Sequence, residues 1–92
     1  MAWIMDQTGK LSINANNSSY IYIESRTNTI KAVLKPGLNG EDVKVTLGTY
    51  QDTDTCKRVL EVISYEAPRN ETVILPLGGD VDTWLANEER YF

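Results

Sequence analysis

Apolar and polar residues alternate along the first half of the chain, a period typical of half-buried β-strands. Turn-forming residues 6–9 and 26–28 each separate two such segments, and therefore predict two hairpins. Pro36 lacks a backbone donor and interrupts the pattern before it resumes. The segments form a meander, predicted to be an antiparallel sheet with one face free to receive a helix. Strands are expected around residues 3–5, 11–13, 20–23, 29–34 and 43–47.

After Tyr50 the apolar period lengthens to that of an α-helix. Asp52 or Asp54 can cap its start, and Pro68 ends it. We therefore expect an amphipathic helix that packs on the sheet, with Cys56 buried in the interface and slow to react with thiol reagents. The apolar stripe, at positions i, i+3, i+4 and i+7, consists of Cys56, Val59, Leu60 and Ile63.

The remainder of the chain predicts one more strand and one more helix. Residues 72–77 have the composition of a strand, and Pro76 favours an edge or terminal position for it. Asp80 can cap a short last helix. Its docking face would consist of Val81, Trp84 and Leu85, followed by Tyr91 or Phe92.

The predicted fold class is α+β: a twisted antiparallel sheet of about five or six strands, one amphipathic helix packed on it, and a short C-terminal helix. A chain of 92 residues is long enough for one core only, so residues 1–92 are expected to form a single domain. Residues 1–77 would contain the sheet and the central helix, and residues 78–92 a C-terminal helical extension. Trp3, at the start of a strand, is expected in the core.

The residue inventory excludes most familiar catalytic sites. The chain has no histidine and one cysteine, which rules out the usual zinc sites and histidine-dependent nucleophiles. The 13 aspartates and glutamates show no recognisable catalytic or calcium-binding spacing, and the glycines match no phosphate-binding loop. We therefore expect a protein that is not an enzyme and has no metal or cofactor.

Three features bear on the compartment. No apolar run approaches the about 18 residues of a membrane span. The first residues lack the basic and long apolar segments of a secretion signal. A lone cysteine fits a reducing environment. These features predict a cytoplasmic protein without membrane contact.

A set of core and turn residues between positions 3 and 63 has a recognisable order and spacing. It comprises Trp3-Ile4, Gly9, Ile21, Ile23, Ile30-Lys31-Ala32, Leu47-Gly48-Thr49-Tyr50 and the helical segment from Cys56 to Ile63. This pattern resembles small uncharacterised accessory proteins of phages and prophages of Gram-positive bacteria. Such relatives usually stop soon after one closing strand, so residues 78–92 are the part most particular to this chain.

The resemblance implies a function by binding. Phage accessory proteins of this size without catalytic residues often block host defence nucleases, as anti-CRISPR proteins do. Others sequester a signal or build the virion. A phage protein of this kind would act in the cytoplasm of the host cell.

The acidic charge is concentrated at the C-terminal end. Residues 1–60 contain seven lysines and arginines against six aspartates and glutamates, whereas residues 61–92 contain two against seven. An acidic surface can dock on a basic groove that otherwise holds nucleic acid. The alternatives are that the charge only solvates the surface, and that the aromatic residues dock on the chain's own core. The candidate partner-binding residues are Glu71, Asp80, Asp82, Trp84, Glu88, Glu89, Tyr91 and Phe92.

The leading hypothesis is a phage- or prophage-encoded protein that inhibits a bacterial defence protein by protein–protein contacts. The partner would be a host protein, in this hypothesis a nucleic-acid-binding defence effector. The alternatives are a structural or homo-oligomeric phage component, including a homodimer, and a protein that sequesters a small nucleotide. Direct nucleic-acid binding is not expected, because the lysines near Tyr20 and Tyr22 are sparse.

Overall fold

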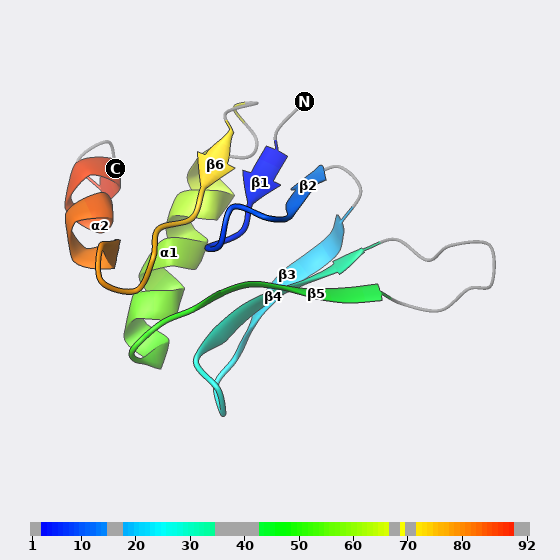
Figure 1. The fold of residues 1–92 in the computed structure, drawn as a ribbon, viewed down its shortest axis with the longest axis horizontal. Coiled ribbons are helices and arrows are strands. Elements are labelled where there is room, and N and C mark those ends of the chain that lie inside the picture. The colour runs from blue at the N-terminus through cyan, green and yellow to red at the C-terminus, as the bar shows by residue number, and fades with distance from the viewer. Residues whose placement is uncertain (1–2, 15–17, 35–42, 67–68, 70–71, 90–92) are drawn as a thin grey trace.

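The computed structural model describes residues 3–14, 18–34, 43–66, 69 and 72–89, and for residues 18, 19 and 89 the backbone alone. It confirms the predicted α+β class (Figure 1). The elements in chain order are β1 (Trp3–Met5), β2 (Ser12–Asn14), β3 (Ser18–Glu24), β4 (Thr29–Leu34), β5 (Val43–Thr49), α1 (Thr53–Glu66), β6 (Val73–Ile74) and α2 (Val81–Glu89).

The strands divide between two three-stranded sheets, where the sequence predicted a single antiparallel sheet of five or six strands. The meander sheet has the order β3-β4-β5 and is antiparallel throughout. The mixed sheet has the order β2-β1-β6, with β1 antiparallel to β2 and parallel to β6. A parallel neighbour requires a crossover connection. Helix α1 lies within that connection. The strand that follows it, β6, therefore pairs with β1 and not with a strand of the meander sheet.

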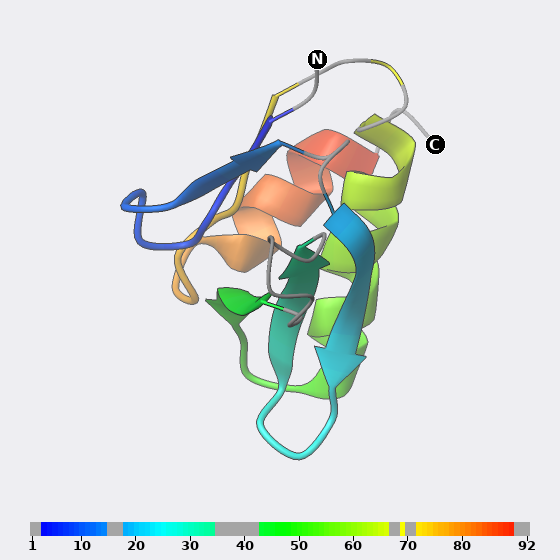
Figure 2. The ribbon, with the colours of Figure 1, turned by 90° about the vertical axis from the view of Figure 1, so that its right-hand side faces the viewer.

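The meander sheet follows the two-residue alternation of its sequence. Ile30 and Ala32 are completely buried and pair with Ile23 and Ile21 on β3. A register shift on the β4–β5 side follows Ile30, where Gly48 is its partner. Helix α1 packs along β3 and β4 (Figures 1 and 2). The predicted helix-covered sheet face is therefore present.

Asp52 provides the cap of α1. Its Oδ1 accepts a hydrogen bond from the Thr55 backbone N–H at 2.7 Å, and its carbonyl accepts the first helical bond, from Cys56. Hydrogen bonding of the Asp52 carboxylate with the Thr55 side chain, and next with the Thr55 backbone N–H, holds the pKa of Asp52 below its ordinary value. Of the two predicted caps, this is the one that forms.

The buried stripe of α1 differs by one position from the prediction. Cys56, Val59 and Ile63 are buried as expected, whereas Leu60 is half-buried and Val62 is fully buried. Val62 faces the part of the core formed by the mixed sheet and α2, which the sequence did not place beside α1. A helix that packs against two layers needs buried apolar residues on more than one of its faces.

Asn28 joins the β3–β4 turn to the start of α1. It has a positive φ of 51°, a conformation that asparagine tolerates better than most residues. Its carbonyl accepts hydrogen bonds from the Tyr50 N–H and the Cys56 thiol, and its side-chain oxygen accepts one from the Thr53 hydroxyl. A turn residue thus fixes the position of the helix N-terminus.

Gln7 joins the two sheets. Its backbone N–H donates to the Leu47 carbonyl at 2.7 Å. Its side-chain amide then makes two bonds to Thr49: Nε2 donates to the carbonyl and Oε1 accepts from the N–H. The amide therefore takes the place of a strand residue beside the end of β5.

The C-terminal helix docks on the core as predicted. Val81 and Leu85 are fully buried, and half-buried Trp84 packs against the same core. The prediction that Trp3 belongs to the core is wrong, because 43% of its surface is exposed. Ile4 takes the inward position in the short strand β1, and alternation turns Trp3 to the outer face. Among the described residues, no helix is long and apolar enough to span a bilayer.

Candidate protein-binding groove

An open groove of about 390 Å³ lies between the C-terminal half of α1, strand β6 and α2. We call it the β6–α2 groove. Figure 1 shows β1 on one side of β6 and α2 on the other. The groove is lined by Val62 and Glu66 of α1, Thr72, Val73 and Ile74 at β6, and Trp84 and Glu88 of α2.

Helical spacing places one apolar and one acidic residue on each helix wall. Val62 and Glu66 are four residues apart on α1, as are Trp84 and Glu88 on α2, so each pair shares one helix face. Val62 is fully buried and forms the apolar floor, while Glu66 and Glu88 are half-buried. The groove therefore combines an apolar floor and an aromatic wall with two carboxylates.

Strand β6 forms the third wall and is an edge strand of the mixed sheet. The Leu75 N–H donates to the Met5 carbonyl at 3.1 Å, on the side of β1. Successive residues of a strand direct their backbone polar groups to opposite edges, so those of Ile74 point away from β1. Ile74 is 57% exposed and lines the groove.

The outer face of the mixed sheet continues the apolar character of the groove. Trp3 and Met5 share this face with Ile74, because Met5 and Ile74 are register partners and Trp3 is two residues from Met5. Trp3 and Ile74 are both exposed large apolar residues. Exposed apolar surface that is contiguous with a groove is typical of a binding site.

The groove contains part of the site predicted from the sequence. Trp84 and Glu88 line it, whereas Asp80 and Asp82 are exposed at the start of α2 and do not. Three predicted residues, Glu71, Tyr91 and Phe92, lie outside the described residues, and Glu89 is described by its backbone only. Glu66 and Ile74 were not predicted, because neither carries a signal that links α1 or β6 to the last helix.

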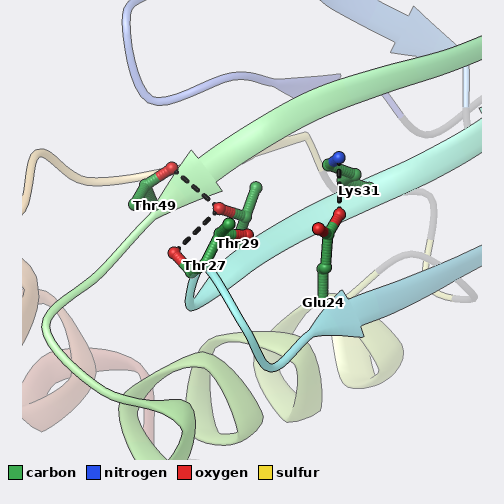
Figure 3. Close-up of polar contacts among 5 residues, drawn as sticks. All are labelled: Glu24, Thr27, Thr29, Lys31 and Thr49. Atoms are coloured by element: carbon green, nitrogen blue, oxygen red, sulfur yellow. Dashed lines mark hydrogen bonds and ion pairs between the residues drawn. The ribbon is translucent and has the colours of Figure 1, made fainter.

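The outer face of the meander sheet presents a different chemistry. Tyr20 is exposed, and its ring centroid lies 5.8 Å from that of Tyr22. Lys31 forms an ion pair of 2.6 Å with Glu24, which lowers the pKa of Glu24 and raises that of Lys31 (Figure 3). The ion pair leaves Lys31 less able to attract a phosphate group.

Neither of the two buried titratable side chains near α1 lines the groove. Burial raises the pKa of the Cys56 thiol, which donates a hydrogen bond to the Asn28 carbonyl at 3.1 Å. Burial also raises the pKa of Tyr50, whose hydroxyl donates to the Pro76 carbonyl at 2.9 Å. These contacts give both groups a structural role.

Within the part of the chain that the structure describes, no group of three or more potential ligands among aspartate, glutamate and cysteine could hold a metal ion. Comparisons with protein-family models, curated proteins and solved structures found no match. A function for this chain therefore has to be argued from the chemistry of the groove.

Proposed function

We propose that this protein is a non-enzymatic binding protein that docks on a basic surface of a partner protein through the β6–α2 groove. The observation that carries the proposal is the combination of an apolar floor with two half-buried carboxylates, Glu66 and Glu88, in one groove. Such a groove suits an apolar side chain flanked by lysine or arginine. The net charge of −4 favours the same partners at long range.

The groove disfavours a small nucleotide as its ligand. Phosphate groups need cations or a cradle of backbone N–H groups, and the groove instead presents carboxylates. Like charges in a partly buried groove repel more strongly than they do in bulk water. A protein cation is therefore the better ligand.

The proposed partner is a bacterial defence protein that binds nucleic acid, and the proposed source of the chain is a phage or prophage. Two points support this more specific form. First, the segment from residue 3 to residue 63 resembles phage accessory proteins. Second, an acidic surface can occupy a basic nucleic-acid channel by mimicking the negative charge of the nucleic acid. The protein would then inhibit by competition.

The test combines affinity capture with charge variants. A bacterial lysate is passed over the immobilised wild-type protein, over the double variant Glu66→Lys with Glu88→Lys, and over Glu61→Lys, which changes an exposed residue of α1 outside the groove. We expect a basic protein to be retained by the wild type and by Glu61→Lys, and lost with the double variant.

The captured protein is then offered labelled DNA and RNA. Displacement of the nucleic acid by the wild-type chain, and not by the double variant, would support competitive inhibition. Equal capture by all three immobilised proteins would refute the role of the groove. Capture without displacement would refute the inhibitory mechanism.

Self-association is the second candidate, and the exposed Trp3 and Ile74 on the outer face of the mixed sheet favour it. Size-exclusion chromatography over a range of concentrations tests it. If the protein forms a dimer that Trp3→Ser dissociates, this face is a homodimer interface. If the protein elutes as a monomer throughout, this candidate is wrong.

A further inference from the structure

We infer that the β6–α2 groove takes its partner as an extended segment that adds a strand to the free edge of β6. The segment would carry an apolar residue between lysines or arginines. This inference rests on the proposed function, because it specifies how the same groove holds a protein partner. It goes further by predicting a backbone hydrogen-bond ladder in addition to side-chain contacts.

The first support is the position of β6 in its sheet. It is the edge strand of the order β2-β1-β6, and its polar groups at Val73 and Leu75 are directed to β1. Those of Ile74 point to the opposite side, where the groove separates β6 from α2. An edge strand that faces a groove can pair with an extended chain.

The second support is the chemistry on the two faces of the incoming strand. A strand added at the usual spacing of about 4.8 Å would direct alternate side chains to the inner and outer faces of the mixed sheet. On the inner face they would meet Val62 and Trp84 in the groove. On the outer face they would lie beside Ile74, which is exposed and apolar. Both faces therefore offer apolar contacts.

The third support is the charge at the groove. Glu66 of α1 and Glu88 of α2 both line it, on the two helices that flank the added strand. Cationic residues next to the apolar anchor could pair with these carboxylates. Acidic segments would be repelled, which restricts the partners to basic segments.

The free edge is short, which limits the length of the ladder. Pro76 has no backbone donor, and its carbonyl accepts the Tyr50 hydroxyl instead. In the part of the chain that the structure describes, the backbone groups directed to this edge are those of Thr72 and Ile74. A ladder of this length orients the segment, while the side chains in the groove determine which segments bind.

The first experiment selects ligands from a display library of random peptides on the immobilised full-length protein. We expect enrichment of peptides with an apolar residue between lysines or arginines, and no such enrichment on the double variant Glu66→Gln with Glu88→Gln. If no peptide is enriched, or if acidic peptides are, the inference is wrong. The proposed function would then still be tested separately by the lysate-capture experiment.

The second experiment separates the ladder from the side-chain contacts. Ile74→Ala removes the exposed side chain and keeps the N–H, whereas Ile74→Pro also removes the N–H at the free edge, where proline is tolerated. We expect an enriched peptide to bind Ile74→Pro about three- to tenfold more weakly than Ile74→Ala, the effect of one hydrogen bond. Equal affinities would overturn the strand addition.

The third experiment needs no variant of the protein. Enriched peptides are synthesised with N-methyl groups at alternate residues, in the two possible registers. An added strand predicts that one register abolishes binding and the other is tolerated, and that the Ile74 amide gains protection from hydrogen exchange in the complex. If both registers bind like the parent peptide and Ile74 stays unprotected, the groove binds side chains only.

Discussion

The two sheets of this protein have three strands each but differ in strand length and in how the chain builds them. In the meander sheet each strand pairs with its neighbour in sequence, as at Ile23 and Ile30. In the mixed sheet Ile4 pairs with Val73, so the first and last strands of the described chain lie side by side. The sheet built from distant segments is also the one that borders the groove. Distant segments can bring together groups that no local segment contains.

A shared core connects the two sheets. Ile4 of the mixed sheet and Ile30 of the meander sheet are both completely buried and belong to the same apolar cluster, together with residues of both helices. The two sheets should therefore unfold together despite their different construction.

Among the variants considered, replacing one of these buried isoleucines is expected to change the free energy of unfolding most. We predict that Ile4→Ala and Ile30→Ala each lower the free energy of unfolding by about 2–5 kcal/mol, through lost apolar contact and a residual cavity. Urea unfolding followed by far-UV circular dichroism and by tryptophan fluorescence should give one coincident transition for each. Two separate transitions in Ile4→Ala would show that the mixed sheet is an independent unit.

Sequence reasoning found the meander sheet, the β1–β2 hairpin and the strand at β6, but it missed that β2, β1 and β6 form a sheet of their own, and the reason is physical. The segment Tyr20–Ile23, the turn at Asn28 and the strand before Pro36 carry their signals within a few residues. Strand β6 has two residues, and nothing at Val73 identifies β1 as its partner. The same holds for the groove: Trp84 and Glu88 were predicted from the last helix alone. Glu66 and Ile74 belong to the groove only because tertiary packing brings three segments together.

The contact between the end of β5 and the segment after β6 tests how the two sheets are held together. Tyr50→Phe removes the hydroxyl that bonds to the Pro76 carbonyl and leaves that acceptor without its partner. We predict a loss of about 1–3 kcal/mol in the free energy of unfolding. Thermal unfolding measures the loss. A change near zero would mean that water replaces the hydroxyl.

Asp6, in the turn of the β1–β2 hairpin, should make the stability of the protein depend on pH. Although burial raises the pKa of Asp6, the hydrogen bonds from the Thr8 hydroxyl and the Leu11 and Lys10 N–H groups outweigh it and lower the pKa overall. Folding thus favours the carboxylate. This stabilisation is fully present above the unfolded-state pKa of about 3.9 and is lost as the pH falls through the lower folded-state pKa.

We therefore predict that Asp6→Ala lowers the free energy of unfolding by about 1 kcal/mol at neutral pH, as loss of a capping side chain does. The difference from wild type should shrink below about pH 4, where the unfolded-state carboxylate becomes protonated, and vanish at lower pH, where the folded-state carboxylate does so too. Urea unfolding across this pH range provides the measurement. A difference that is constant with pH would show that the charge has no part in the effect.

The ion pair on the outer face of the meander sheet should contribute least to the stability of the fold. Glu24 and Lys31 are both partly exposed, and exposed pairs are weakened by solvent and salt. We predict that Glu24→Gln leaves the midpoint of thermal unfolding almost unchanged at physiological salt. It should also leave binding at the groove intact, since neither residue lines it. A large decrease in the midpoint would show that this pair organises the sheet.

The parallel pairing of β1 with β6 also affects the order in which the protein forms during synthesis. Strand β1 is synthesised before the meander sheet, but its partner β6 follows α1, so the entropy of closing this long loop delays the pairing. We expect β4 amides to gain protection before the Leu75 amide in pulsed hydrogen exchange during refolding. A nascent chain could then hold its meander sheet while the β6–α2 groove does not yet exist.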